Sequence, residues 1–203
     1  MKKIALVLNS PSLNRLPKDA DIVICADGGA RYYNAPDILL GDMDSLNTEN
    51  NAKKTIVLPV HKDYTDGEFA IKYIYENLMP ACVDIYGMTG GRLDQVLGNL
   101  TLLYMAKNYG IQATGHSDTE DIYFVTDASL SIEAKENDTI SIVPFKTDVY
   151  VDGTNLEYPL DNLRIPMDST LGISNKVVED GLVQLFFRGS AFVIHCIKSL
   201  FNN

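Results

Sequence analysis

The sequence is short of positive charge, with 17 lysine and arginine residues against 27 aspartate and glutamate residues in a chain of 203. The formal net charge of −10 is opposite in sign to the cationic surface that binds nucleic-acid phosphates. The sequence also lacks any apolar stretch approaching the roughly 18 to 20 residues of a membrane-spanning helix. We therefore expect neither a nucleic-acid partner nor a membrane partner.

Cysteine is scarce as well. The three cysteines, Cys25, Cys82 and Cys196, are far apart and lie in apolar runs, which predicts reduced core residues rather than disulfides or metal ligands. The apolar run at residues 4–8 is too short for a signal peptide and leads into Asn9-Ser10-Pro11 without a small-residue cleavage site. These features together predict a cytoplasmic protein.

The first half of the chain, to about residue 117, alternates short apolar runs with amphipathic stretches. The apolar runs are rich in valine and isoleucine, which is typical of strands buried on both faces of a parallel sheet. They occupy residues 4–8, 22–26, 38–40, 56–58 and 83–86. Alternation of strands with helices predicts an α/β domain over residues 1–117, with a mostly parallel, Rossmann-like sheet.

Two helices are predicted in this half. The sequence Thr65-Asp66-Gly67-Glu68 is a capping box, and the helix that it opens has one apolar stripe. That stripe comprises Phe69, Ala70, Tyr73, Ile74 and Leu78. A second helix is predicted over residues 92–108, and its expected core face comprises Leu93, Val96, Leu97, Leu100, Leu103 and Tyr104.

From about residue 118 the helical periodicity disappears, and short β-prone runs alternate with turn sequences. These runs occupy residues 121–126, 130–133, 139–144, 149–152, 182–187 and 191–197. Short strands without helices predict an all-β sandwich domain over residues 118–203. A domain this small has a modest core, so we expect it to pack against its neighbour or a second copy.

A polar or glycine-rich cluster follows each predicted strand of the first half. In an open α/β sheet the carboxyl ends of the strands form the ligand-binding edge, so these clusters should meet at one cleft. They lie at residues 9–10, 27–29, 41–45, 61–66 and 89–94. The shared placement of the clusters, rather than any single motif, predicts a binding site.

Asp42 and Asp44 are two residues apart at a strand end, so an extended backbone would point both side chains the same way. Such carboxylates repel each other, and a bound cation removes that cost. With Asp27 and Asp66 expected at the same edge, the oxygen donors predict a Mg²⁺ site. Taken alone, the Asp42 motif is also compatible with a turn and a helix cap.

The glycine pairs Gly28-Gly29 and Gly90-Gly91 would let backbone amides approach an anion, although either pair alone is typical of a turn. Lys62 and Arg92 would supply positive charge to a polyphosphate, and Asn99 shares a helix face with Arg92. The three histidines show no ligand spacing, and no nucleophile–histidine–carboxylate arrangement is evident. Covalent catalysis is therefore disfavoured.

At this point the motifs, in their order and spacing, resemble the thiamine pyrophosphokinase family. In the first half they are Ala26–Ala30, Pro36-Asp37, Gly41-Asp42-Met43-Asp44-Ser45, Lys62–Asp66, and Gly90–Asp94 with Asn99. In the second half they are Tyr158-Pro159-Leu160 and Gly172-Ile173-Ser174-Asn175. The absence of tryptophan departs from some family members, which stack an aromatic ring near the thiamine pyrimidine.

The resemblance implies transfer of a pyrophosphoryl group from ATP to the hydroxyethyl oxygen of thiamine, giving thiamine diphosphate and AMP. It implies a Mg²⁺-dependent homodimer with an ATP-binding α/β domain and a thiamine-binding sandwich supplied by the other subunit. The implied metal ligands are Asp42, Asp44 and Asp66; the ATP-binding residues are Asp27, Gly28, Gly29, Ser45, Lys62, Arg92 and Asn99; and the thiamine-binding residues are Ser174 and Asn175. The catalytic set is Asp66, Asp94, Arg92 and Lys62, in which Asp94 or Asp66 would orient the alcohol proton.

Three other functions use parts of the same pattern. A pterin pyrophosphokinase shares the nucleotide-domain motifs but does not account for Gly172-Ile173-Ser174-Asn175. A metal-dependent nucleotide hydrolase would use the same cleft with water as the acceptor, and a non-catalytic thiamine or nucleotide sensor would bind without turnover. AMP formation that requires thiamine distinguishes the pyrophosphokinase from all three.

Overall fold

The computed structural model describes residues 2–43, 51–78 and 81–201 of the chain. The chain divides into two compact units, residues 1–118 and 119–203. Unit 1 combines a parallel sheet with helices, and unit 2 consists almost entirely of antiparallel strands. The expectation of an α/β half followed by an all-β half is therefore confirmed at this level.

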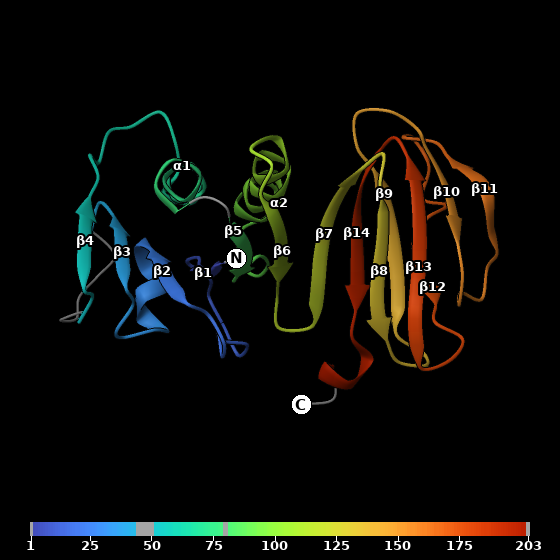
Figure 1. The fold of residues 1–203 in the computed structure, drawn as a ribbon, viewed down its shortest axis with the longest axis horizontal. Coiled ribbons are helices and arrows are strands. Elements are labelled where there is room, and N and C mark those ends of the chain that lie inside the picture. Colours follow the sequence, from blue (N-terminus) through green and yellow to red (C-terminus); the bar gives the residue numbers. More distant parts are fainter. Residues whose placement is uncertain (1, 44–50, 79–80, 202–203) are drawn as a thin grey trace. The chain divides into compact units, whose positions relative to one another are not determined.

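Unit 1 is built on six strands in the order β6-β5-β1-β2-β3-β4, and all the neighbouring pairs are parallel (Figure 1). Their bounds are β1 Lys2–Val7, β2 Ile22–Ala26, β3 Ile38–Gly41, β4 Lys54–Val57, β5 Ala81–Tyr86 and β6 Gln112–His116. The first five correspond to the predicted apolar runs. Strand β6 was not predicted, because its sequence, Gln-Ala-Thr-Gly-His, has no apolar run.

Two α-helices, α1 (Asp66–Leu78) and α2 (Leu93–Asn108), lie side by side over the sheet of unit 1 (Figure 1). A short 3₁₀ helix, η1 (Asp27–Arg31), follows β2 and packs against β2 and β3. In β1 the alternate residues Ala5 and Val7 belong to a core cluster that also includes Ala30 of η1. Strand β2 ends at Ala26 and η1 begins at Asp27, so η1 starts at the carboxyl edge of the sheet. The packing of Ala30 in this cluster holds η1 there.

The predicted core faces of the two helices are partly wrong. Helix α1 buries Ala70, Ile71 and Ile74, whereas the predicted Phe69 and Tyr73 are only half-buried and stack on each other at 6.4 Å between ring centroids. The buried face of α1 thus includes the predicted Ala70 and Ile74, but it is completed by Ile71 rather than by the two aromatic residues. The aromatic rings flank the core instead of filling it.

The first turns of α2 differ more strongly from the prediction, because Leu93 and Leu97 are 72% and 55% exposed. The buried residues of α2 are Leu102, Leu103 and Ala106, in its second half. Asn99 contacts the carbonyl of Met88 just after β5, so the turns before Asn99 extend past the sheet edge and have no strand beneath them. Helical periodicity in the sequence does not show where a helix leaves the sheet.

Unit 2 contains two antiparallel sheets, in the orders β12-β9-β14-β7 and β11-β10-β13-β8 (Figure 1). The strands are β7 Glu120–Thr126, β8 Ser129–Ala134, β9 Thr139–Pro144, β10 Val149–Gly153, β11 Leu160–Ile165, β12 Asn175–Lys176, β13 Gly181–Arg188 and β14 Ser190–Cys196. A short 3₁₀ helix, η2 (Lys198–Leu200), follows β14. Residues of both sheets form one core cluster, and β13 buries every second residue, as expected where two sheets pack face to face.

The cysteines are all free thiols, but only one is fully buried. Cys25 of β2 is buried, and burial raises the pKa of its thiol to about 12, which makes it unreactive. Cys82 and Cys196 are half-buried, so the prediction of three core cysteines is wrong for these two. Neither α-helix in the described part of the chain has the length and apolar character needed to cross a membrane.

Candidate active site

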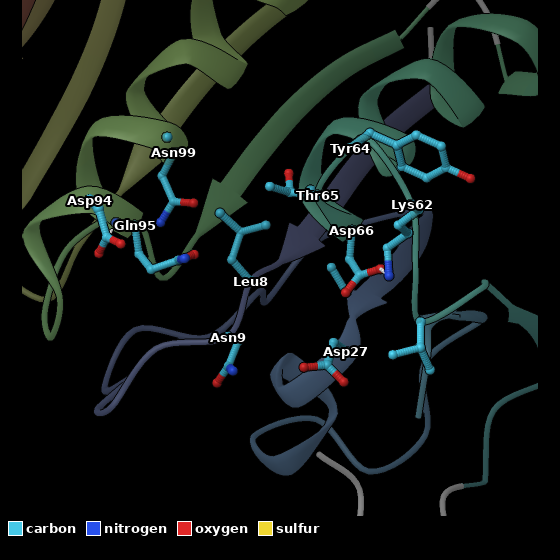
Figure 2. A pocket seen from close by; sticks show the side chains of 14 residues that line it. Leu8, Asn9, Asp27, Lys62, Tyr64, Thr65, Asp66, Asp94, Gln95 and Asn99 are labelled. Atoms are coloured by element: carbon cyan, nitrogen blue, oxygen red, sulfur yellow. Dashed lines mark hydrogen bonds and ion pairs between the residues drawn. The ribbon is translucent and has the colours of Figure 1, made fainter. Parts of the chain in front are cut away.

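A groove of about 370 Å³ lies at the carboxyl ends of β1 and β2 (Figure 2). Its walls come from the segment after β1, the start of η1, the loop before α1 and the first turns of α1 and α2. The residues that line it are Leu8, Asn9, Ala26, Asp27, Val60, Lys62, Tyr64, Thr65, Asp66, Gly67, Asp94, Gln95, Gly98 and Asn99. We call this the acidic groove, because three of these residues are aspartates.

Five of the predicted site residues line the acidic groove, and they come from distant parts of the sequence. They are Asp27, Lys62, Asp66, Asp94 and Asn99. Figure 2 shows Lys62 and Asp66 pointing toward each other on one side, with Asp94 and Asn99 on α2 at the other. Two other predicted residues, Asp44 and Ser45, lie outside the described residues.

Lys62 is the central cation of the acidic groove. Its side chain is 8% exposed, and its Nζ atom lies 3.1 Å from an Asp66 oxygen and 3.4 Å from an Asp42 oxygen. Nζ also donates to the carbonyl of Pro59 at 3.2 Å. Burial alone would lower the pKa of Lys62, but the carboxylates of Asp66 and Asp42 outweigh burial and raise it. Lys62 is therefore protonated and links two carboxylates.

Asp66 is placed by the start of α1. The Thr65 hydroxyl oxygen accepts a hydrogen bond from the Glu68 backbone N–H at 3.1 Å, which confirms that threonine caps this helix. Burial raises the pKa of Asp66, and the nearby charges of Asp27 and Asp42 add to that effect, although Lys62 opposes it. The ionised form of Asp66 is thus less favourable in this groove than it would be in water.

Asp27 begins η1 with a φ of +43°, a left-handed backbone conformation that is uncommon for any residue but glycine. The end of β3 packs against it: a Cβ on Gly41, whose φ is +149°, would meet the Asp27 Cα at 3.1 Å. Among the described residues, the buried Oδ1 atom of Asp27 has no hydrogen-bond partner. Such an unpaired oxygen is costly in a fold unless a ligand satisfies it.

The donor set of the acidic groove fits a hard divalent cation. Among the described residues, the Oδ1 atoms of Asp27 and Asp66 are both buried without a hydrogen bond, and Asp66 Oδ1 lies in an ion pair with Lys62. Carboxylate oxygens of this kind are the ligands that Mg²⁺ prefers. Within residues 2–43, 51–78 and 81–201, however, no three carboxylate, histidine or cysteine side chains are grouped closely enough to hold a metal. A site would therefore combine these oxygens with other ligands.

Arg92 and Asp94 form an exposed ion pair at the start of α2. Two guanidinium nitrogens of Arg92, Nε and Nη2, donate to the two oxygens of Asp94 at 3.1 and 2.5 Å. This pairing lowers the pKa of Asp94 and raises that of Arg92. In this structure the positive charge predicted to meet a polyphosphate is thus compensated by its neighbour.

The predicted Asn99 and Gly29 have local structural contacts of their own. The Asn99 side chain donates to the Met88 carbonyl at 3.1 Å, which ties α2 to the segment after β5. A Cβ on Gly29 would lie 2.3 Å from the Val7 carbonyl oxygen, so η1 can approach β1 only with glycine there. Gly28 is buried beside Gly29. The close approach to the Val7 carbonyl therefore requires glycine at position 29 whether or not a ligand is bound.

In unit 2, Asn175, one of the two predicted thiamine-binding residues, is buried, with 8% exposure. Its side chain forms hydrogen bonds with the backbone of Tyr158. Its Oδ1 atom accepts from the Tyr158 N–H at 2.9 Å, and its Nδ2 atom donates to the Tyr158 carbonyl at 2.8 Å. Its neighbour Ser174 has a φ of +60° and donates its backbone N–H to the Ser141 hydroxyl. Asn175 thus fixes the Tyr158–Leu160 segment, which borders an apolar groove of about 520 Å³ within unit 2.

Two further residues line the grooves: Asn9, which belongs to the predicted polar cluster at residues 9–10, and Arg31, which the sequence did not indicate. Asn9 lies at the boundary of two grooves, and Arg31 at the end of η1 lines the second of them. The polar cluster after β1 indicated Asn9. Arg31 had no signal, because a lone arginine after a glycine pair is typical of a solvated surface residue.

The fold and the site define an α/β unit with a charged groove at the carboxyl edge of a parallel sheet, joined to a β-sandwich unit. Comparisons with known proteins agree with this division. Residues 13–114 match the family model "Thiamin pyrophosphokinase, catalytic domain". Residues 128–188 match "Thiamin pyrophosphokinase, vitamin B1 binding domain".

Individual relatives agree with the family models. The thiamine pyrophosphokinase of Bacillus subtilis (strain 168) is 33% identical over 162 residues, covering 76% of this chain and 75% of the relative. The crystal structure of a Bacillus subtilis thiamine pyrophosphokinase superposes with a TM-score of 0.84 at 27% identity, covering 97% of this chain and 99% of the other. The Geobacillus thermodenitrificans structure gives a TM-score of 0.80 at 26% identity, covering 96% and 97%. The chain belongs to the thiamine pyrophosphokinase family.

Proposed function

We propose that this chain is a thiamine pyrophosphokinase that transfers the pyrophosphoryl group of ATP to the hydroxyethyl oxygen of thiamine. The observation that carries this proposal is that the two family models match one unit each. The unit that matches the catalytic model also contains a groove lined by the predicted charged residues. The match of unit 2 to a vitamin B1 binding domain favours thiamine over a pterin or water as acceptor. Unit 1 would be the Rossmann-like, ATP-binding catalytic domain.

The acidic groove would hold Mg²⁺ through Asp42 and Asp66, with Asp27 beside them and Asp44, outside the described residues, as a third ligand. The buried Asp27 Oδ1 atom, which has no hydrogen-bond partner among the described residues, supports this assignment, and Asp66 Oδ1 faces only the ammonium group of Lys62. When bound, the ion would offset the negative charge of the phosphates and fix their orientation. Without it, three lining aspartates would repel ATP.

Lys62 and Arg92 would exchange their carboxylate partners for phosphate oxygens when ATP binds. Both are held by aspartates in this structure: Lys62, which lines the acidic groove, by Asp42 and Asp66, and Arg92, at the start of α2, by Asp94. A pre-positioned cation loses little freedom when it changes from one oxyanion to another. The exchange would also release Asp94 from Arg92.

In the reaction, the thiamine hydroxyl oxygen forms a bond to the β-phosphorus of ATP. The bond between that phosphorus and the oxygen bridging to the α-phosphate breaks, and AMP leaves with the bridging oxygen. The hydroxyl proton passes to a carboxylate, for which Asp94 and Asp66 are the two candidates lining the groove. The remaining Asp27, Gly28, Gly29, Ser45 and Asn99 would position ATP.

Ser174 and Asn175 would position thiamine from unit 2. Asn175 would act indirectly, because its side chain holds the backbone of Tyr158 at the border of the apolar groove. The homodimer, in which the sandwich of one copy serves the other copy, rests on the family resemblance and is a proposal that light scattering of the purified protein would test. A cytoplasmic location is likewise proposed.

The decisive experiment incubates the protein with Mg-ATP and, in parallel, thiamine, hydroxymethyldihydropterin or no acceptor. We expect AMP and thiamine diphosphate to form in equal amounts with thiamine only, as measured by chromatography. AMP release without an acceptor, or turnover of the pterin, would overturn the proposal. Asp42→Asn removes one proposed metal ligand and should abolish turnover while circular dichroism shows an intact fold.

A further inference from the structure

A second groove, of about 270 Å³, adjoins the acidic groove and shares Asn9 and Gln95 with it. Its walls come from the segment after β1, the end of η1 and the glycine turn before α2. Two arginines, Arg31 and Arg92, line it. We call it the basic groove, because no aspartate or glutamate is among the described residues that line it.

Arg31 is held in place by neutral groups. Its Nη2 atom donates to the Asn9 Oδ1 atom at 2.6 Å, and its Nε atom donates to the Gly28 carbonyl at 3.2 Å. An amide oxygen and a backbone carbonyl orient a guanidinium group without cancelling its charge. The planar fork of arginine suits two phosphate oxygens, so an oriented and uncompensated arginine is prepared for that ligand.

The other two cations of the site differ from Arg31 in this respect. Lys62 lies between two aspartates, and Arg92 is paired with Asp94. In the part of the chain that the structure describes, no carboxylate lies within ion-pair distance of Arg31. Arg31 is therefore the cation of these grooves that can bind an anion without first leaving a carboxylate.

The surrounding backbone is fitted to this arginine. A Cβ on Gly28 would lie 2.3 Å from Arg31 Nη2 and 2.6 Å from the Asn9 Oδ1 atom, so any side chain at position 28 would displace the pair. In the glycine turn that also lines the basic groove, Gly90 and Gly91 have φ values of +98° and +71°, which glycine adopts readily. A Cβ at either position would meet the Pro11 ring at 3.3 Å, so glycine lets this turn pack against Pro11.

We propose that Arg31 binds the α-phosphate of the nucleotide, the phosphate that stays on AMP, and that it does so without a divalent cation. The identity of the nucleotide rests on the proposed function, whereas the binding of a phosphate group follows from the basic groove itself. The acidic groove needs a cation to accept phosphates, and the basic groove does not. The two grooves would thus divide the triphosphate between a metal-dependent part and a metal-independent part.

The test measures AMP binding by calorimetry in EDTA, so that no divalent cation contributes. We compare the full-length chain with Arg31→Gln, which keeps a hydrogen-bond donor but removes the charge, and with Arg31→Lys. Lys72→Ala, which removes a positive charge from the exposed side of α1, is the matched control. We expect Arg31→Gln to weaken AMP binding about tenfold or more, Arg31→Lys to weaken it less, and the control to match the parent.

Asn9→Asp separates ligand binding from a purely structural role of Arg31. The substitution keeps the shape of residue 9 and strengthens its contact with Arg31, but it places a carboxylate against the guanidinium. If Arg31 binds phosphate, Asn9→Asp weakens AMP binding without lowering the melting temperature. If Arg31 only braces η1, Asn9→Asp leaves AMP binding unchanged, and the inference is wrong.

The outcomes also separate this inference from the proposed function. Thiamine turnover with unchanged AMP affinity in Arg31→Gln overturns the role of Arg31 and leaves the proposed function standing. Arg31-dependent AMP binding in a chain that does not turn over thiamine overturns the proposed function and leaves the role of Arg31 standing. A parent chain that binds no AMP in EDTA overturns the inference.

Discussion

Asp66 in unit 1 and Asp138 in unit 2 are both carboxylates largely shielded from solvent, but their surroundings shift the carboxyl pKa in opposite directions. The Asp138 side chain is 2% exposed, and it accepts hydrogen bonds from the backbone N–H groups of Lys135 and Lys198 and from His195 Nε2 at 2.8 to 2.9 Å. Burial alone would raise the pKa of Asp138, but these hydrogen bonds outweigh burial and lower it. Asp66, by contrast, has a pKa raised chiefly by burial.

The difference separates a carboxylate that stabilises the fold from one that is kept for a ligand. Asp138 ties the start of β9 to β14 and to the segment after it, and its charge is satisfied within unit 2. Asp66 and Asp27 each leave a buried oxygen without a hydrogen bond among the described residues. A buried oxygen without a hydrogen bond destabilises the fold, and a bound cation or substrate that contacts the oxygen offsets this destabilisation.

The largest expected effect is on catalysis at Asp66. We expect Asp66→Asn to lower kcat for thiamine diphosphate formation by about 10²- to 10³-fold, the usual cost of removing one charged group from a polar active site. Its melting temperature at neutral pH should not fall, because folding raises the pKa of Asp66 and its ionisation therefore costs stability. Steady-state kinetics and calorimetry measure the two quantities, with the exposed Asp19→Asn as control. Near-normal kcat in Asp66→Asn would remove Asp66 from the catalytic set.

The next effect is on stability at Asp138. Asparagine there cannot accept every hydrogen bond that the carboxylate accepts, so we expect Asp138→Asn to lower the free energy of unfolding by about 2 to 4 kcal/mol. Denaturant unfolding measures this change, and Asp161→Asn, at an exposed position of β11, is the matched control. Equal stability of the two variants would show that the Asp138 hydrogen bonds contribute little.

A smaller effect concerns the pH dependence of stability. The pKa of Asp138 is lowered on folding, so its contribution is present above the unfolded value of about 3.9 and is lost as pH falls through the folded value. The pKa of Asp66 is raised, so its ionisation costs stability as pH rises from about 3.9 through the folded value. Melting curves between about pH 3 and pH 7 should therefore show Asp138→Asn approaching the parent at low pH, whereas Asp66→Asn gains on the parent toward neutrality. Parallel curves for all three proteins would contradict both assignments.

The smallest effect is the stabilisation of unit 1 by the metal alone. A cation that binds only the folded chain, at about ten times its dissociation constant, adds about 1.4 kcal/mol, or a few degrees in melting temperature. We expect millimolar Mg²⁺ to raise the melting temperature of the parent and to raise that of Asp66→Asn less. An equal shift in both proteins would place the ion elsewhere.

Much of the fold could be predicted from the sequence, because buried strands need continuous apolar runs and amphipathic strands need alternation. Strand β9 was predicted over residues 139–144 and has those bounds. Strands β6, β11 and β12 were missed. Strand β6 has no apolar run, β11 (Leu160–Ile165) mixes apolar with charged and amide residues, and β12 has only two residues. The exposed start of α2 was missed because periodicity reports a helix face and not what lies beneath it.

The candidate site was less predictable than the fold. Position after a strand located Asp27, Lys62 and Asp66, because the carboxyl ends of parallel strands share one edge. Partners could not be predicted in the same way: that Arg92 pairs with Asp94, or that Asn175 holds a backbone segment, depends on side-chain geometry. The position of Arg31 depends on a contact with Asn9, which is 22 residues away in the chain.

The glycine at position 29 has a consequence for how this protein tolerates change. Because even a methyl group there would collide with the Val7 carbonyl oxygen, the separation between the two backbone segments is fixed by the smallest residue available. Saturation mutagenesis should therefore find this position intolerant in assays of folded protein as well as of turnover. Variants selected for a new acceptor or nucleotide could therefore differ in the side chains around the grooves, but they should keep glycine at position 29 and the same spacing between β1 and η1.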